Sequence, residues 1–203
     1  MPYDVVKRFE AQLCEYTRAK YAVTTNSCTM ALLLAVKWHL RDGWRGPFDS
    51  MVSIPKRTYI SVPMSIIHAG GRPVFRDVNW LGQYKLEPLP VWDSARTFTS
   101  GMYLQGQMQC VSFHASKILG DTQGGAILHD DDEVDAWFRR MRFDGRTGGV
   151  APISDNFREI GYHCYMSPDV ASRLLLKLYS LLVHNQPLPN DNYPDLSEME
   201  IFK

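Results

Sequence analysis

Apolar residues recur at helical spacing in several segments of the chain. The clearest case is segment 5–16, in which Val5, Phe9, Leu13 and Tyr16 fall on one face of a helix. Segment 29–41 is rich in Ala and Leu and predicts a second helix. The same reasoning predicts further helices over residues 59–69, 132–142 and 168–182.

Short, largely apolar runs bounded by Gly, Pro or Asp lie between the predicted helices. Such runs are typical of strands that are buried on both faces. They predict strands at residues 21–25, 51–55, 72–78, 89–95, 109–114 and 126–129. Because these strands are separated by helices, we expect an α/β fold of three layers, α/β/α, around a mostly parallel sheet.

The tail from Asn185 is rich in Pro and contains an Asn-Asp-Asn run, a composition typical of irregular structure. The 203 residues can bury a full hydrophobic core. We therefore expect one large domain over residues 1–184, followed by an irregular C-terminal arm over residues 185–203.

The charge balance bears on the partners of the chain. Its 22 Lys and Arg residues match its 22 Asp and Glu residues, and no basic run or stripe occurs. Composition thus offers no electrostatic argument for a nucleic-acid partner, and a small-molecule substrate fits better.

The cysteines and the amino terminus bear on location. The four cysteines are far apart and show no paired metal-ligand spacing, which fits reduced thiols rather than a disulfide framework. The amino terminus lacks the basic segment followed by an apolar segment that marks a signal peptide. No apolar stretch approaches the length of a membrane span. We expect a cytoplasmic protein without a membrane partner.

A run of small polar residues marks the junction between the strand at 21–25 and the helix that follows. Free amides and the positive end of the helix dipole make such a junction a potential anion site, to which the hydroxyls of Ser27 and Thr29 could add hydrogen bonds. An ordinary N-cap is the commoner explanation of this pattern when it is taken alone.

Three further residues could carry chemistry, and each also has an ordinary structural explanation. Tyr59 could cover a flat ligand or pack in the core. Asp93 lies at the carboxyl end of a predicted apolar strand, which is where α/β sheets bind ligands. Its ordinary explanation is a cap of the next turn. Lys117 follows a strand by a few residues, and an amine in a partly desolvated loop becomes a nucleophile when its pKa falls, although most lysines are solvated. Ser167 is expected as the N-cap of the last helix.

The order of these segments adds to what each indicates alone. The chain contains, in sequence, Phe9-Glu10, Tyr21-Ala-Val, Ser27-Cys-Thr-Met-Ala-Leu, Ile54-Pro with Thr58-Tyr, His68-Ala-Gly-Gly-Arg-Pro, Asp93-Ser-Ala, Ser112-Phe-His-Ala-Ser-Lys117 with Gly124-Gly-Ala, and Gly161-Tyr-His-Cys-Tyr-Met-Ser. This succession resembles the DegT/DnrJ/EryC1/StrS family of sugar aminotransferases, which depend on pyridoxal 5'-phosphate (PLP). The family belongs to the aspartate aminotransferase superfamily, fold type I. The resemblance extends from about residue 9 to residue 182.

The resemblance implies a PLP-transferase large domain and a role for each motif. Lys117 would hold PLP as an internal aldimine, and Asp93 would pair with the pyridinium nitrogen. Tyr59 would stack on the pyridine ring. The cofactor phosphate would be held by the hydroxyl-bearing turn and the start of the lysine block, namely Ser27, Cys28, Thr29 and Ser112.

Three positions depart from the family pattern. Arg96 replaces the Gln near the ring oxygen of the cofactor and could favour the anionic form of that oxygen. Gln123 replaces the Glu of a Gly-Glu-Gly-Gly stretch. His163 replaces an Asn that, in the family, reaches the phosphate of the neighbouring subunit. The resemblance therefore implies a homodimer with a shared active site, held partly by the Pro-rich arm.

The chain is also shorter than the family pattern. Only 15 residues separate Asp77 from Asp93, whereas a further strand and helix belong there in the family, and such a unit takes roughly 30 residues. We expect one strand-helix unit and the small C-terminal domain to be missing, so that the substrate pocket is built differently.

Three functions compete at this point. The first is transfer of an amino group from an amino acid such as glutamate to a nucleotide-linked keto sugar. The second is another PLP reaction, such as decarboxylation or elimination, and the third is a non-catalytic protein that keeps the PLP fold. Retention of both Lys117 and Asp93 argues against the third. Lys117 also argues against the family branch that dehydrates sugars, which has His at this position.

Overall fold

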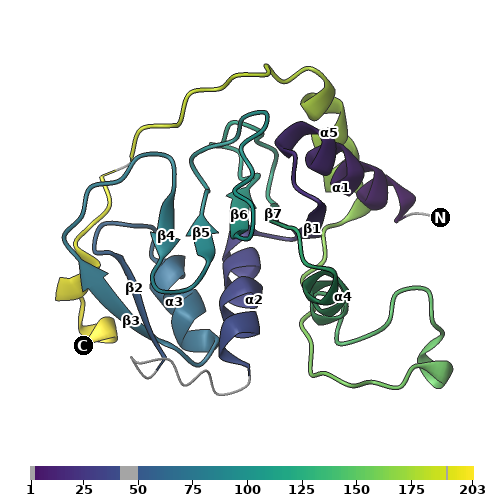
Figure 1. Cartoon of the computed structure of the whole chain (residues 1–203), viewed down its shortest axis with the longest axis horizontal. Coiled ribbons are helices and arrows are strands. Elements are labelled where there is room, and N and C mark those ends of the chain that lie inside the picture. Colours follow the sequence, from purple (N-terminus) through teal and green to yellow (C-terminus); the bar gives the residue numbers. More distant parts are fainter. Residues whose placement is uncertain (1–2, 42–49, 191) are drawn as a thin grey trace.

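Helices and strands alternate along most of the chain. The computed structural model describes residues 3–41, 50–190 and 192–203. The helices in these ranges are α1 (Asp4–Thr17), α2 (Cys28–Leu40), α3 (Ser61–His68), α4 (Asp132–Met141) and α5 (Pro168–Tyr179). The strands are β1 (Tyr21–Thr25), β2 (Met51–Pro55), β3 (Arg72–Arg76), β4 (Tyr84–Leu86), β5 (Val91–Asp93), β6 (Met108–Ser112) and β7 (Gly125–His129) (Figure 1).

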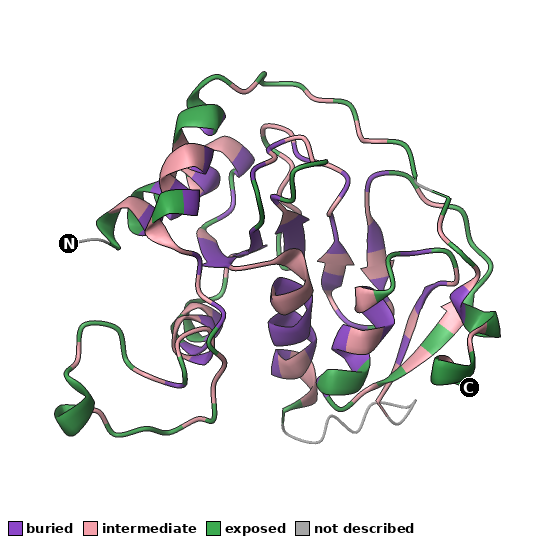
Figure 2. Ribbon diagram, turned by 180° about the vertical axis from the view of Figure 1, so that it is seen from behind, coloured by how far each residue is buried: buried purple, intermediate pink, exposed green. Residues whose placement is uncertain are grey.

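Two hydrophobic clusters on opposite faces of the sheet establish the three layers. Along β1 and β7, successive side chains alternate between the two clusters: Val23 and Ile127 pack with α2, α3 and α4, whereas Ala22 and Leu128 pack with α1 and α5. This alternation is the period of two expected of a strand. Figure 2 shows the buried residues concentrated in the strands and in the helix faces turned toward them. The predicted α/β/α architecture is thus confirmed.

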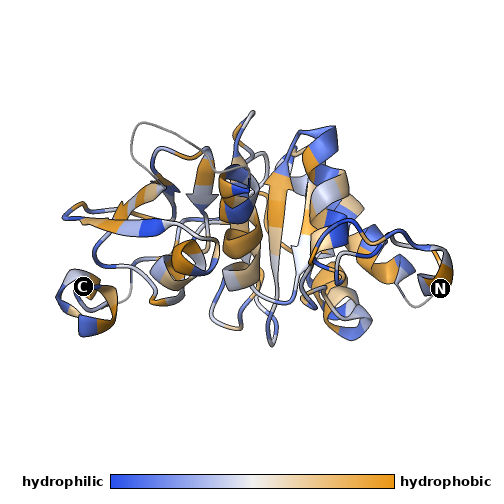
Figure 3. Cartoon of the chain, turned by 90° about the horizontal axis from the view of Figure 1, so that it is seen from below, coloured by the Kyte–Doolittle hydropathy of each residue, from blue (hydrophilic) through white to orange (hydrophobic). Residues whose placement is uncertain are grey.

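Helix α2 is the central helix of the first cluster. Every residue from Ala31 to Val36 is buried, so this part of the helix has no polar face. A helix that is apolar all round belongs inside a core. Figure 3 shows α2 near the centre of the molecule with a largely hydrophobic surface. The Ala- and Leu-rich composition of this segment follows from that position.

The strands pair in a mixed rather than a mostly parallel manner, which corrects that detail of the prediction. The five-stranded sheet has the order β1-β7-β6-β5-β4, and β2 and β3 form a separate two-stranded parallel pair. Within the larger sheet, β5 pairs parallel with β6, while β1–β7, β6–β7 and β4–β5 are antiparallel. The pattern of apolar runs could not reveal this, because burial on both faces does not depend on strand direction.

The stretch between β3 and β5 lacks a helix, as the short spacing between Asp77 and Asp93 predicts. Residues 77–90 are all described; they contain no helix, and their only strand is the three-residue β4, which was not predicted. β4 runs antiparallel to β5, and just after β4 the chain reaches β2 through a bridge between Ser53 and Glu87. A short reversed strand therefore stands where the family pattern has a strand-helix unit, and it connects the two sheets.

The arm at 185–203 packs along the chain's own surface. In Figure 1 it runs from α5 across the top of the molecule to the neighbourhood of β3. The amides of Leu188 and Leu196 donate to the carbonyl oxygens of Arg96 (2.8 Å) and Lys56 (2.9 Å), and the Leu196 side chain is fully buried. Lys56 Nζ lies 2.8 Å from Asp195, and this hydrogen bond lowers the pKa of the carboxyl to about 2. The arm is irregular, as predicted, yet it is anchored at several points.

The segment between α4 and α5 extends away from the body of the molecule (Figure 1). Ile153 and Ile160 in this segment are almost fully exposed, and Phe157 is about half exposed. Apolar side chains gathered on one exposed segment are typical of a surface that contacts another molecule.

Within the described ranges, no helix is long and apolar enough to cross a membrane.

The four cysteines are free thiols, and burial raises the pKa of each of them above its ordinary value. Cysteine chemistry is therefore suppressed at neutral pH, since the thiolate is the reactive form.

Candidate active site

Four strands end at the same edge of the molecule. β1, β5 and β6 share one direction, because β1 and β6 both run antiparallel to β7 while β5 is parallel to β6. β2 has the same direction, since its bridge to the β4 segment is antiparallel. In open α/β sheets, ligands bind beyond the carboxyl ends of the parallel strands. The segments that follow these four strands meet around a cavity of about 450 Å³.

Most of the predicted site residues line this one cavity. The predicted residues that line it are Ser27, Cys28, Thr29, Tyr59, Asp93, Arg96, Ser112 and Lys117. They come from four separate parts of the sequence, so the fold brings together motifs that are up to 90 positions apart, from Ser27 to Lys117.

The amino terminus of α2 forms one wall of the cavity. The Ser27 hydroxyl accepts a hydrogen bond from the Met30 amide (3.2 Å), so Ser27 is an N-cap, as its ordinary explanation held. A Cβ built on Gly125 of β7 would lie 2.5 Å from the Cys28 amide nitrogen. Only glycine lets the first turn of α2 lie this close to the sheet. The positive end of the helix dipole is thereby placed at the cavity, where it favours an anion.

Asp93 is a buried carboxyl group at the end of β5, with 5% of its surface exposed. Its Oδ1 accepts a hydrogen bond from the Ala95 amide (3.0 Å), and its Oδ2 accepts one from the Tyr84 hydroxyl (2.9 Å). Burial raises the pKa of Asp93 above its ordinary value, an effect opposed by these two donors and by the charges of Lys117 and Arg96. A carboxyl group placed this way is suited to a cationic or hydrogen-bonding ligand.

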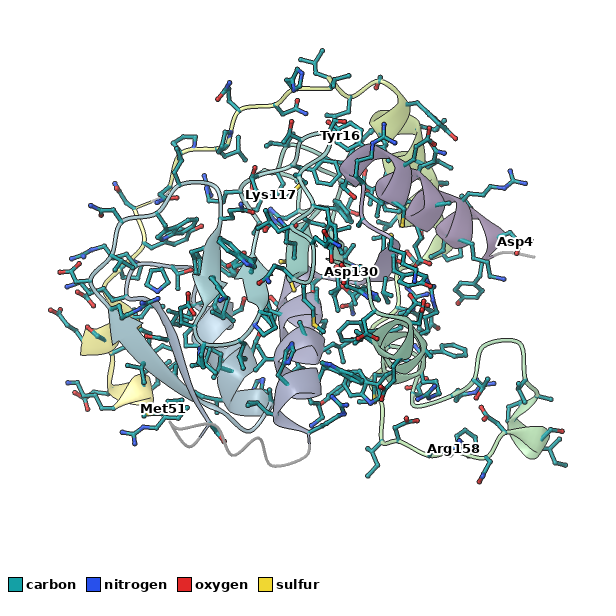
Figure 4. All side chains as sticks on the ribbon, viewed as in Figure 1. Asp4, Tyr16, Met51, Lys117, Asp130 and Arg158 are labelled. Atoms are coloured by element: carbon teal, nitrogen blue, oxygen red, sulfur yellow. The ribbon has the colours of Figure 1, made fainter. Side chains whose placement is uncertain are left out.

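Lys117 lies in the loop that follows β6 and is labelled in Figure 4 above the ends of the central strands. Its amide donates to the His114 carbonyl oxygen (2.8 Å), which makes the loop turn tightly. A Cβ on Gly120 would lie 2.8 Å from the Lys117 carbonyl oxygen, so this glycine permits the turn. Asp121 then fixes the loop to α5 by accepting from Arg173 and Lys177, each at 2.9 Å. The lysine is therefore on a well-anchored loop.

Tyr59 and Arg96 take different positions at the cavity. Tyr59 is 57% exposed, so it is a rim residue rather than the core residue of its ordinary explanation. Arg96 is buried, and its Nη1 lies 3.4 Å from the hydroxyl of Tyr193 in the arm. The arm thus contributes a side chain to the cavity wall.

His163 is not brought to the main cavity. It lines a smaller neighbouring cavity of about 190 Å³ that shares Gln123 and Gly124 with the first. Its ring is 70% exposed and its Nδ1 lies 2.9 Å from Asp144 Oδ2. Its contact with a neighbouring subunit stays a prediction.

Several cavity residues were not found from the sequence. They include Thr58, Ser61, Trp80, His114, Ser116 and Tyr193. Thr58 was quoted beside Tyr59 without a role, and its position after β2 was a usable signal. Trp80 lies in the shortened stretch and Tyr193 in the arm, where neither spacing nor periodicity marks a ligand site.

Comparison with known proteins identifies the family. A model described as the DegT/DnrJ/EryC1/StrS aminotransferase family matches residues 1–90 and 100–185. The chain is 40% identical over 182 residues to the spore coat polysaccharide biosynthesis protein SpsC of Bacillus subtilis, an alignment that covers 69% of this chain and 46% of SpsC.

A second relative is the UDP-4-amino-4,6-dideoxy-N-acetyl-beta-L-altrosamine transaminase of Campylobacter jejuni. It is 25% identical over 224 residues, covering 89% of this chain and 57% of that protein. Among solved structures, NtdA from Bacillus subtilis with bound cofactor PMP matches with a TM-score of 0.69 and 17% identity, covering 87% of this chain and 48% of NtdA.

The chain spans about half the length of the curated relatives it matches. The family match nevertheless covers most of the sequence, and it includes the segments that supply cavity residues such as Ser27, Tyr59 and Lys117. This chain belongs to the DegT/DnrJ/EryC1/StrS aminotransferase family.

Proposed function

We propose that this chain is a PLP-dependent aminotransferase that acts on a keto sugar and uses Lys117 and Asp93 as its central residues. The observation that carries the proposal is their placement: an amine and a buried carboxyl group line one cavity together with a helix amino terminus. These groups match three of the polar features of PLP, namely its aldehyde, its ring nitrogen and its phosphate.

The residues at the cavity fit the cofactor chemically. The first turn of α2 and the hydroxyls of Ser27, Thr29 and Ser112 would hold the phosphate. Asp93 would keep the ring nitrogen protonated, and two hydrogen-bond donors support its ionised form. When bound, PLP supplies an electron sink for the electrons of a broken bond to the substrate carbon.

The chain's own residues would then perform the remaining tasks. Lys117 would hold the cofactor covalently and, once displaced by the incoming amine, move a proton between the substrate carbon and the cofactor. Tyr59 would cover the ring from the rim of the cavity, and Arg96 would favour the anionic form of the ring oxygen.

The substrate class rests on the relatives. One is named as a transaminase of an amino sugar linked to UDP, and another takes part in spore coat polysaccharide biosynthesis. We infer that an amino acid donates the amino group and that a nucleotide-linked keto sugar accepts it. The alternatives, another PLP reaction or a non-catalytic PLP-binding protein, differ from this reaction in their spectra and products.

A homodimer with a shared active site belongs to the same proposal, as does a cytoplasmic location. Exposed apolar residues between α4 and α5 and on α5, including Ile153, Ile160 and Leu176, support contact with a second copy. His163 would face the neighbouring subunit. The arm packs on its own chain and lines the cavity with Tyr193, and we propose that it also helps to hold the dimer. We also propose the domain division 1–184 and 185–203, because the described residues of the arm form only short 3-10 helices after α5.

The first test records the visible spectrum of the protein with PLP before and after reduction with borohydride. The parent should show an absorption band near that of a PLP imine, and reduction should fix the cofactor onto Lys117, as mass spectrometry of the peptides would show. Lys117→Ala should lose the band, while Lys85→Ala, which removes a lysine outside the cavity, should keep it.

A product assay then distinguishes transamination from decarboxylation. With an amino acid donor, a transaminase converts the bound cofactor to its amine form and releases a keto acid, whereas a decarboxylase releases carbon dioxide. No band in the parent at saturating PLP would overturn the enzyme proposal and leave a fold that has kept its motifs without the chemistry.

A further inference from the structure

Tyr84 is a buried phenol that no predicted role accounts for. It lies on β4, directly opposite Asp93 on β5 in the register of the antiparallel pair. Its hydroxyl donates to Asp93 Oδ2 at 2.9 Å and lies 2.5 Å from the hydroxyl of Thr58. Thr58 and Tyr84 are both buried, and Thr58 lines the cavity.

The direction of this hydrogen-bond chain follows from its last member. An ionised carboxylate only accepts hydrogen bonds, so Tyr84 must donate to Asp93, and Thr58 must then donate to Tyr84. Burial raises the pKa of the Tyr84 phenol well above its ordinary value, so its proton stays in place at neutral pH. The chain Thr58–Tyr84–Asp93 therefore has one arrangement of donors and acceptors.

The position of Tyr84 is fixed by its neighbours. The Trp80 ring packs edge-on against the Tyr84 ring, with 4.8 Å between centroids, and β4 pairs with β5 over its full length. The Ala95 amide meanwhile engages the other oxygen of Asp93. Two donors from different segments thus hold the carboxylate in a single orientation.

We propose that Tyr84 is the positioning residue of this site, which orients Asp93 and keeps it ionised for the ring nitrogen of the cofactor. The proposal rests on the function proposed above. It also gives β4 a purpose: the short strand that stands in place of a strand-helix unit supplies a donor to the carboxylate of the site.

The test compares two ligands that differ in one atom. One is PLP, and the other is its 1-deaza analogue, in which carbon replaces the ring nitrogen, so that it offers Asp93 nothing to bind. The parent should prefer PLP over the analogue. Tyr84→Phe should reduce that preference about tenfold, because a hydrogen bond to a charged group is lost, while its affinity for the analogue stays unchanged.

Two controls separate positioning from general damage. Tyr103→Phe removes a phenol hydroxyl that donates to the Gln107 carbonyl oxygen outside the cavity, and should leave the preference intact. Thr58→Val keeps the phenol but removes the donor behind it, and should reduce the preference less than Tyr84→Phe does. If Tyr84→Phe does not fold, Thr58→Val alone still tests the chain, since an unchanged preference would contradict it.

The outcomes separate this inference from the proposed function. If Tyr84→Phe lowers the affinity for both ligands equally, Tyr84 only supports the fold around the cavity. If it changes neither affinity, Tyr84 has no part in holding Asp93. Either result overturns the inference while the proposed function stands. A parent that binds neither ligand would overturn the proposed function, and the inference with it.

Discussion

The carboxyl group of Asp93 is buried in the wall of the cavity, where its negative charge is costly in the absence of a ligand. Burial raises the pKa of Asp93 above 3.8, so the folded chain holds this proton more tightly than the unfolded chain does. Stability therefore falls as pH rises from 3.8 through the raised value, and above that window the cost is complete. A residue kept at such a cost is typical of a functional site.

We expect Asp93→Asn to stabilise the cofactor-free protein at neutral pH. The amide can accept from Ala95 with its oxygen and donate to Tyr84 with its nitrogen, because the Tyr84 hydroxyl can donate to Thr58 instead. A gain of about 1 kcal/mol would raise the melting temperature by roughly 2–4 °C. The difference should vanish below pH 3.8, where Asp93 itself is neutral. A variant that melts earlier than the parent at neutral pH would contradict this account.

At the residue scale, motifs predicted residues that line the cavity and lie at or just after the ends of strands, such as Ser27, Asp93 and Lys117. The carboxyl end of a strand is visible in sequence as the place where an apolar run meets polar residues. Tyr84 and Tyr193 could not be predicted in this way. Each reaches the site through the packing of a segment with no periodic pattern, and a tyrosine in such a segment is ordinary.

At the element scale, one buried acid joins three elements. Glu10 of α1 accepts from the amide and the hydroxyl of Thr24 on β1, and from Arg139 (2.7 Å) of α4 and Arg142 (2.5 Å) just after it. Burial acts to raise the pKa of Glu10, but the charges of Arg142 and Arg139 outweigh it and lower the pKa. β1 leads into Ser27 after one residue, so this cluster also fixes the strand that positions the amino terminus of α2.

Glu10→Ala should destabilise the protein by about 3 kcal/mol, because removing one partner leaves a largely buried guanidinium and the Thr24 amide without their acceptor. Urea denaturation of the cofactor-free protein measures this loss. Glu133→Ala is the matched control, since Glu133 is exposed and lies 3.9 Å from Arg41, and it should change stability by less than about 1 kcal/mol. Equal effects of the two variants would show that the Glu10 cluster contributes no more than a surface pair.

The helices and the longer strands could be predicted because burial gives them a regular apolar pattern. The strand predicted at 89–95 forms only at Val91–Asp93, since the chain turns away where pairing with β6 ends. The reversed strand β4 escaped prediction because three residues are too few to show a period. Strand direction escaped for a different reason, since it is set by the connections between strands rather than by which faces are buried.

At the scale of the whole molecule, the arm at 185–203 couples the end of α5 to the cavity and to β2 and β3. Tyr193 stacks on Trp80 with 6.3 Å between ring centroids, and Phe202 packs against Phe75 of β3. Among the described residues of the arm, Tyr193 lines the cavity, so the arm supplies part of one wall.

Leu196→Ala should release the arm without unfolding the domain. Truncation of a buried leucine costs about 2–5 kcal/mol, and the arm can avoid that cost by detaching. Hydrogen exchange at the amides of residues 188 and 196 should therefore become at least about tenfold faster, while exchange in β6 stays unchanged. Ile67→Ala, at an exposed position of α3, should change neither. Faster exchange in β6 as well would show that the arm and the sheet unfold as one unit.

The arm touches the cavity through Tyr193 and is otherwise held on the surface of the domain by a few anchors, whereas the predicted site residues at the cavity lie at or after strand ends. Changes in the arm can therefore alter one wall of the cavity while the sheet order and the residues at the strand ends stay the same. In evolutionary terms the arm is a separable module, so selection can change this wall of the cavity without disturbing the residues at the strand ends.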